Sequence, residues 1–465
     1  MVDDEKIEEV DEEHAVAPLS EITAQRPVEP TDIQRRPGGA PLYDSHGGDN
    51  AIAELVAEPP VDRVSSAQQE REQEQQAPSR RPSSELPPLS KLATKLYTIS
   101  YLIFFAIFGT LARLGLQALT YYPGAPIVTG VLWANFGGCV LMGFFIEDRN
   151  IFREEWGHPP HPSDHSTDSA WVKKHKTVKK SIPLYIGLTT GFCGSFTSFS
   201  SFMRDAFLAL SNDLADPSAS LSAMQGRNRG DSFMAVVAVL IFTVSFSISG
   251  LYLGAHIALA LDPWIPTVPF RITRNILDRV VVLLGWGCWL GAVFMSIWPP
   301  ENSWRGQAVF AIVFAPLGCL FRFYASLLLN PRVPYFPLGT FVVNIIGTGI
   351  LGMCYDLQHV SGIGASPPSF WGVVYPEPSR ASLFGGDSYI SSLVVSCQVL
   401  QGVMDGFCGC ATTVSTWAAE LTSLGRRRFA YIYGGVSMAA GLGLLVAVMG
   451  SVRWSRGFDS PICTT

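Results

Sequence analysis

The first 90 residues contain almost no aromatic residue and are instead rich in Pro, Glu, Gln and Ser. A segment of this composition cannot bury enough apolar surface to offset the entropy lost on ordering. About 20 Asp and Glu residues outnumber about 10 Lys and Arg residues in residues 1–95. The segment also lacks the apolar core of a signal peptide, so membrane targeting would come from a later hydrophobic segment. We therefore predict a disordered, acidic, cytosolic tail over residues 1–95.

The rest of the chain lacks the motifs of an enzyme or of a nucleic-acid-binding protein. It contains no nucleophile with an oriented base, no phosphate-binding loop and no basic patch for nucleic acid. Hydrophobic residues make up 48% of the chain and the mean hydropathy is +0.25, which is too apolar for an ordinary soluble enzyme. Eight of the nine cysteines, all except Cys463, lie in apolar segments, so we expect buried small hydrophobes rather than disulfides or a metal site.

Hydrophobic runs of about 20 residues, the length that crosses a bilayer, recur after the tail. We predict nine membrane-spanning helices, at residues 97–120, 126–147, 182–210, 232–260, 279–298, 306–329, 335–356, 390–421 and 429–451. The third and eighth runs are long and rich in Gly, Ser and Thr, so each is expected to break midway. The predicted fold is an all-α polytopic membrane protein.

Positive charges in the loops predict the orientation, because Lys and Arg stay on the cytosolic side. Lysines cluster in loop 148–181 and arginines in loops 261–278 and 422–428, whereas loop 121–125 has no positive charge. This pattern places the N-terminus in the cytosol and the C-terminus outside. Four arginines depart from it: Arg227, Arg229, Arg453 and Arg456.

Similar residues recur at a constant spacing. Pairs 209 residues apart are Arg113 and Arg322, Asn135 and Asn344, and Gly143 and Gly352. Pairs 215 residues apart are Gly194 and Gly409, and Thr197 and Thr412. A shared register over three helices indicates a duplication.

Each copy has four predicted helices, and a ninth lies between them. The odd number makes the second copy enter from the opposite side, which gives an inverted repeat with its functional site near mid-bilayer. We predict two four-helix repeats at residues 96–262 and 304–452, a linker with the inverting helix at 263–303, and a short tail at 453–465.

The most polar stretch in an apolar run is residues 191–202, GFCGSFTSFSSF, and a weaker copy, GFCGCATTVSTW, occupies residues 406–417. Small polar residues in a membrane helix pack helices or line a path. Gly194 and Thr197 would also loosen the helical ladder and free carbonyl groups. We interpret this stretch as the centre of an ion pathway.

These motifs resemble the fluoride channel family, the Fluc or CrcB proteins, over about residues 97–451. The repeat with its linker helix is similar to the two-domain eukaryotic form, the FEX fluoride exporters. The family's Gly-x-x-x-Arg motif occurs twice, ending at Arg113 and Arg322, and its third-helix pattern of Gly, Thr, Ser and Phe matches residues 191–202. The second copy departs from that pattern at Val414 and Trp417.

The resemblance implies a single-chain, dimer-like channel that lets F⁻ leave the cytosol passively across the plasma membrane. We place ten residues on the predicted ion pathway: Asn135, Asn344, Phe199, Phe202, Ser198, Ser200, Thr413, Ser415, Arg113 and Arg322. The family's structural Na⁺, held by carbonyls of the broken helices, would map to Gly194, Thr197, Gly409 and Thr412. The expected partners are fluoride and the lipid bilayer, with no nucleic acid.

Chemistry supports these roles but leaves alternatives. The amides of Asn135 and Asn344 could donate to F⁻ without trapping it, or could instead bond a neighbouring helix. Phe199 and Phe202 project from nearly one face, and their positive ring edges could face an anion or simply pack. Because Val414 has no ring, we predict one competent path and one degraded path, with Trp417 filling space.

Other polar groups in the predicted spans are equally open. Arg113 and Arg322 could give a vestibule positive potential, or could pair with Asp205, Glu420 or helix carboxyl ends. Hydroxyls on the fourth helix could extend the track or bond their own helix: Thr243, Ser245, Ser247 and Ser249. A small-residue stripe in the last helix is expected to pack: Gly435, Ala439 and Gly443.

Two further function classes compete with a passive channel. In a coupled anion/proton antiporter, Asp205 or Glu420 would carry protons. A membrane scaffold or sensor would conduct nothing.

Overall fold

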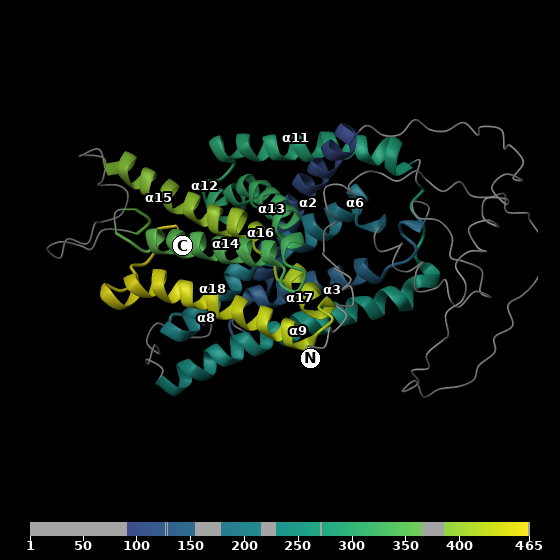
Figure 1. The fold of residues 1–465 in the computed structure, drawn as a ribbon. Helices are drawn as coiled ribbons and strands as arrows, with labels where there is room; N and C mark the ends of the chain where they lie inside the picture. The colour runs from purple at the N-terminus through teal and green to yellow at the C-terminus, as the bar shows by residue number, and fades with distance from the viewer. Residues whose placement is uncertain are drawn as a thin grey trace, which may run out of the picture. The chain divides into compact units, whose positions relative to one another are not determined.

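The computed structural model describes residues 91–153 (except 126 and 128), 178–214, 229–269, 272–365 (except 362) and 386–463. Its regular elements in these ranges are all helices, with no strand (Figure 1). The predicted tail, residues 1–95, lies outside the described residues apart from its last five. The prediction of an all-α polytopic membrane protein is confirmed.

Eight helical segments of the described ranges are long and apolar enough to cross a membrane. They are Leu92–Thr120, Gly130–Glu147, Gly230–Trp264, Thr273–Ile297, Arg305–Arg332, Leu338–Gln358, Ser392–Ser423 and Arg427–Ser455. The predicted third span, residues 182–210, is not among these eight; in the structure it consists of four consecutive helical pieces. The count of nine spans and the inverted repeat therefore stay predictions.

The helices of the first copy are α2 (Lys91–Thr120), α3 (Gly130–Glu147), α6 (Pro183–Ile186), η1 (Gly187–Cys193), α7 (Gly194–Phe196), α8 (Phe199–Ser211) and α9 (Arg229–Leu261). Those of the second copy are α13 (Phe310–Leu329), α14 (Leu338–Gln358), α15 (Gly386–Gly402), η7 (Val403–Cys408), α16 (Gly409–Ala411), α17 (Ser415–Ser423) and α18 (Arg427–Ser455). The linker contributes α11 (Asp278–Ile297). In each copy a π-helical segment, η1 or η7, leads into the break.

Both predicted breaks are present, and each falls directly after a threonine. Thr197 and Thr412 have ψ angles of 153° and 150°, which ends the preceding helix. The next helix starts on a hydroxyl cap, because the Ser198 side chain accepts a hydrogen bond from the Ser201 N–H at 3.2 Å. Thr413 accepts from the Thr416 N–H at 3.4 Å in the same way. The two short hydroxyl runs therefore stop one helix and start another.

The helices that follow the breaks pack on the opposite copy. α8 lies against α14 and α18, and α17 lies against α3 and α9 (Figure 1). The largest buried cluster forms where these helices meet and includes Phe199, Phe202, Val414 and Trp417. The described helices of the two copies therefore share one core.

The linker helix α11 packs mainly against α2, and also contacts α13, at the edge of the bundle (Figure 1). Its Trp286 indole donates to Ser100 Oγ at 3.1 Å, and its Trp289 indole donates to the Val313 carbonyl at 2.9 Å. Other apolar side chains of α11 face outward, among them Leu283 at 77% exposure, as suits a helix facing lipid.

One disulfide corrects the expectation that no cysteine is paired: Cys397 of α15 is bonded to Cys463 near the C-terminus. The chain after α18 folds back along the end of α14, where the Asp459 N–H donates to the His359 carbonyl at 3.1 Å. Asp459 also accepts from the Ser361 N–H at 3.2 Å. This return of the tail, which no local pattern signals, brings the two cysteines together. The other seven cysteines are free, as expected.

The small-residue stripe on α18 is not a packing face within the described chain. Gly435, Ala439 and Gly443 are exposed, and nothing lies within 4 Å of a Cβ placed at either glycine. The buried face is the neighbouring one, with Gly434, Ser437 and Gly441. The 3.6-residue period puts these two stripes about 100° apart, and only tertiary contacts distinguish them.

Candidate functional site

Each break is closed by a hydroxyl from the other copy. The Thr197 hydroxyl accepts hydrogen bonds from the N–H groups of Val414 at 3.2 Å and Ser415 at 3.1 Å. In the matching arrangement, Thr412 accepts from the Ser200 N–H at 3.0 Å. Breaking a helix leaves N–H groups without partners, and these reciprocal bonds satisfy them away from water.

The hydroxyl residues placed on the predicted ion pathway belong to the same network and are fully buried. Ser415 Oγ donates to the Cys193 carbonyl at 3.1 Å, and Ser200 Oγ to the Cys408 carbonyl at 3.4 Å. Ser198 and Thr413 cap the helices that follow. All four residues hold the breaks in place, and their role in passing an ion remains a prediction.

The two asparagines use their oxygens alike and their nitrogens differently. Asn135 Oδ1 accepts from the Ser198 N–H, and Asn344 Oδ1 accepts from the Thr413 N–H, both at 2.9 Å. Asn344 Nδ2 also donates to the Thr413 carbonyl at 3.3 Å. Asn135 Nδ2 is buried and has no hydrogen-bond partner among the described residues. The oxygen therefore braces the break, and of the two amide nitrogens that of Asn135 is the one without a partner among the described residues.

The arginines reach across to the opposite break. Arg322 donates from Nη2 to the Thr190 carbonyl of the first copy at 2.7 Å, and from Nε to the Cys410 carbonyl of its own copy at 2.8 Å. Arg113 donates to the Asp405 carbonyl. Both side chains are buried, at 1% and 2% exposure, so neither stands at an open vestibule. Of the alternatives left open, bonding to carbonyls of the interrupted helices is the one observed.

Two glycines make room for these guanidinium groups. A Cβ at Gly194 would collide with Arg322, and a Cβ at Gly409 would collide with Arg113. The glycines predicted as Na⁺ ligands are therefore positions where a cationic side chain approaches the main chain.

The aromatic residues form a chain of three rings that crosses between copies. Phe199 and Phe202 have ring centroids 5.9 Å apart with planes at 90°. Phe199 and Trp417 have centroids 5.6 Å apart with planes at 64°. Phe199 thus faces a ring of the opposite copy as closely as one of its own, whereas Val414 offers none.

The residues predicted to hold Na⁺ fit that ion only in part. The main-chain carbonyls of Thr197 and Thr412 leave the helical ladder, and oxygen donors suit hard cations. Gly194 and Gly409 fit poorly, because each adjoins a guanidinium group that would repel a second cation.

The two acids lie within α8 and α17 in different surroundings. Asp205 accepts from the neighbouring Arg204 at 3.0 Å. Glu420, at 1% exposure, accepts from Thr340 at 2.6 Å, Tyr433 at 2.7 Å and Asn330 at 3.4 Å. Neither acid pairs with Arg113 or Arg322.

A cavity of about 240 Å³ opens between α3, α9 and α17, with Lys179, Lys180 and Glu420 in its lining. Met142 on its α3 wall lies seven residues, two helical turns, beyond Asn135 on the same face. Leu251 on its α9 wall lies one turn beyond the buried Ser247. The buried Thr243 continues this face, whereas Ser245 and Ser249 are exposed. The α3 wall of the cavity therefore lies on the same helix face as Asn135.

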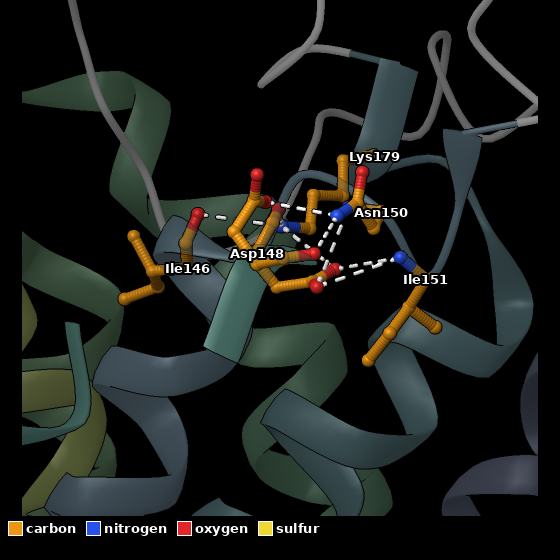
Figure 2. Close-up of polar contacts among 6 residues, drawn as sticks. Ile146, Asp148, Asn150, Ile151 and Lys179 are labelled. Carbon is orange, nitrogen blue, oxygen red and sulfur yellow. Dashed lines mark hydrogen bonds and ion pairs between the residues drawn. The ribbon is translucent and has the colours of Figure 1, made fainter. Parts of the chain in front are cut away.

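Lys179 lies in the lining of the cavity. Figure 2 shows its contacts with Ile146 and Asp148. Its Nζ donates to the Asp148 carbonyl and, at 3.3 Å, to the Ile146 carbonyl, which closes the end of α3. Its distance to the Asp148 carboxylate is 4.0 Å. Burial nevertheless raises the pKa of Asp148, against the lowering effect of Lys179.

Two features escaped sequence reasoning. Trp417 was expected only to fill space, yet its indole N–H is buried without a partner among the described residues. The Glu420 network was missed because Asn330, Thr340 and Tyr433 come from three different segments. The sequence did contain one sign of the Trp417 donor, because Trp417 stands where the first copy has Phe202.

Long apolar helices and two interlocked helix breaks define the protein as a polytopic membrane protein of the broken-helix kind. The family model for the CrcB-like proteins, described as camphor resistance (CrcB), matches residues 100–255 and 309–451. The chain belongs to the CrcB family. The two matched segments correspond to the two copies predicted from the spacing.

Several curated relatives resemble the chain. Fluoride export protein 1 of Neurospora crassa is 52% identical over 428 residues, covering 87% of this chain and 75% of that protein. Fluoride export protein 1 of Candida albicans is 34% identical over 358 residues, covering 76% of this chain and 79% of that protein. The fluoride-specific ion channel FluC of Thermococcus gammatolerans is 35% identical over 133 residues, 29% of this chain and 81% of that protein. No solved structure matches.

Proposed function

We propose that the protein is a passive, fluoride-selective channel that exports F⁻ from the cytosol and so limits fluoride toxicity. The relatives named as fluoride exporters and fluoride-specific channels support this function. An inside-negative potential drives an anion outward with about 2.3 kcal/mol per charge per 100 mV.

The observation that carries the proposal is the free amide donor of Asn135. A fully buried N–H group without a partner is uncommon, and leaving one costs about 1–3 kcal/mol. F⁻ must exchange its hydration water for such donors, and a neutral amide holds it without the fixed charge that would trap it. The cavity beside Lys179 would supply ions to this donor.

We further propose that one chain forms the whole channel, as two copies in opposite orientations. FluC of T. gammatolerans aligns with less than a third of this chain, which supports a doubled unit. The reciprocal bonds of Thr197 and Thr412 have the symmetry expected of such a pair. The carbonyls of Thr197 and Thr412 would hold the structural Na⁺, which would screen the carbonyl dipoles at the crossing point.

For the orientation, we propose a cytosolic N-terminus and an external C-terminus in the plasma membrane. The disulfide between Cys397 and Cys463 supports the external side, because disulfides persist in oxidising compartments. The lysines at the cavity favour the cytosolic side for that end of α3.

Fluoride-electrode efflux from proteoliposomes tests the function. The purified chain should release F⁻ when voltage alone drives it, and should leave chloride trapped in a parallel sample. Liposomes that retain both ions would refute the proposal.

A further inference from the structure

The indole of Trp417 is a hydrogen-bond donor placed where nothing in the described chain receives it. Trp417 is 1% exposed, and its Nε1 has no partner among the described residues. An indole N–H can only donate. Buried polar groups are bonded in more than about 90% of cases, so an orphaned donor indicates a ligand or water that the chain alone does not supply.

The surroundings of Trp417 are aromatic rings, the apolar side chains of Met203 and Leu421, and small residues of α18. Phe199 approaches Trp417 across the boundary between copies, with ring centroids 5.6 Å apart. Both rings lie on the same face of α18, where a Cβ at Gly441 would be 3.2 Å from Phe199 Cε1 and one at Gly434 would be 3.8 Å from Trp417 Cζ2. Ser437, fully buried, lies on this face between the two glycines.

These groups suit an anion better than a water molecule. The edges of aromatic rings carry positive partial charge, and the indole N–H is the strongest positive point on a tryptophan edge. A water molecule needs acceptors as well as donors to complete its bonds. The indole N–H and the ring edges supply donors, which a small monovalent anion can use fully. Ser437 Oγ on the same face gives its proton to the Tyr433 carbonyl at 2.7 Å.

We propose that the Trp417 indole N–H binds fluoride on the conduction path, opposite Phe199. The aromatic pair of this path is then formed across the two copies, and Trp417 is a donor that discriminates for fluoride rather than a filler. This inference rests on the proposed function and adds to it a residue of the second copy. Val414, which has no edge to offer, lies outside the pair.

Trp417→Phe tests the role directly, because it keeps a ring and removes only the N–H group. Loss of a hydrogen bond to an ion should raise the fluoride concentration for half-maximal conductance about tenfold. The same variant should lower the fluoride-to-chloride permeability ratio. The matched control is Trp454→Phe, an indole on α18 that is 61% exposed, and it should leave both quantities unchanged.

A binding measurement separates this inference from the function itself. In full-length protein labelled with ¹⁵N-tryptophan, the indole N–H signal that disappears in Trp417→Phe should shift on titration with NaF and stay fixed with NaCl. Trp417→Tyr provides the same assignment should the Phe variant fail to fold. If the wild-type protein conducts fluoride while this signal stays fixed, the inference is overturned and the channel stands. If the wild-type protein conducts none, the proposed function fails and the inference with it.

Discussion

The two copies share a helix break but differ in the chemistry around it. Both breaks follow a threonine, both are braced by an asparagine oxygen, and both receive an arginine from the other copy. The first copy then offers Phe199 and Phe202, whereas the second has Val414 and Trp417. The features that hold the break are duplicated, and those that would meet the ion are not.

The same contrast extends along the helices after the breaks. Arg204 and Asp205 form an ion pair in α8, while the second copy has Ala419 and Glu420, with the acid held by three neutral donors. Symmetry therefore follows structural need, since unsatisfied backbone groups in lipid are costly for either copy. Positions free of that need differ between the two copies.

Substituting the two glycines that face the arginines should cause the largest change, and equally in both copies. Gly194→Ala and Gly409→Ala each force a methyl group against a buried guanidinium group. Each should lower the free energy of unfolding by about 1–3 kcal/mol, because the end of the arginine side chain must move to admit the methyl group. Thermal unfolding in detergent, followed by size-exclusion chromatography, measures this. Gly435→Ala is the control, since open space surrounds that position; matching stability losses at all three sites would contradict the account.

Asn135→Asp and Asn344→Asp should have different effects in the two copies. Both keep the oxygen that braces the break and replace the amide donor by a negative charge. At residue 135 the lost donor has no protein partner, so fluoride efflux should fall more than tenfold. At residue 344 the new carboxylate faces the Thr413 carbonyl, so the melting temperature should fall further. Equal losses of efflux and of stability at both sites would contradict the different roles of the two asparagines.

Phe199→Leu and Val414→Ala compare the matching positions at the start of α8 and directly before α17. Leucine fills much of the space but has no positive edge, so Phe199→Leu should lower fluoride efflux about tenfold. Val414→Ala should change efflux less than about threefold, although it costs stability by opening a cavity. Proteoliposome efflux, normalised to the amount of inserted protein, measures both. A larger loss for Val414→Ala would reverse the assignment.

Glu420→Gln addresses the coupled-antiporter alternative. Glutamine keeps an oxygen for Thr340 and Asn330, so the network should survive with a stability loss of about 1–2 kcal/mol. Efflux driven by voltage without a pH gradient should stay within about threefold of the wild type, because no proton step limits a channel. Dependence of wild-type efflux on a pH gradient, abolished in Glu420→Gln, would favour the antiporter.

The smallest predicted effect is a pH-dependent loss of stability at the end of α3. Lys179 closes this end, whereas the C-terminal tail covers the end of α14. Burial raises the pKa of Asp148 above its ordinary 3.8, so the folded state holds this proton more tightly than the unfolded state. That contribution is complete below pH 3.8 and is lost as the pH rises through the raised value. Relative to Asp148→Asn, the wild type should lose about 1 kcal/mol or less over this range. If the stability difference between the wild type and Asp148→Asn is the same at pH 4 and pH 7, the pKa of Asp148 is not raised.

The sequence was sufficient for what is local and for what is repeated. Hydroxyl runs located both breaks, and the constant spacing paired Asn135 with Asn344 and Arg113 with Arg322. It was insufficient for contacts between distant segments. Which break each arginine enters, which ring faces Phe199, and that the tail returns to Cys397 all depend on tertiary packing.

The wrongly assigned stripe on α18 has the same physical origin. Gly435, Ala439 and Gly443 obey a small-residue rule as well as Gly434 and Gly441 do. Helical periodicity identifies faces of a helix, but it does not say which one meets a neighbour. In a membrane the outer surface is also apolar, so hydrophobicity gives no further guidance.

The reversal potential of the purified protein in a planar bilayer tests the central claim most directly. A passive fluoride channel should reverse at the fluoride equilibrium potential, shifting by about 59 mV for each tenfold change in the fluoride gradient. The reversal potential should be the same with or without a pH difference. A reversal potential that follows the pH difference, or one that follows chloride, would contradict the account.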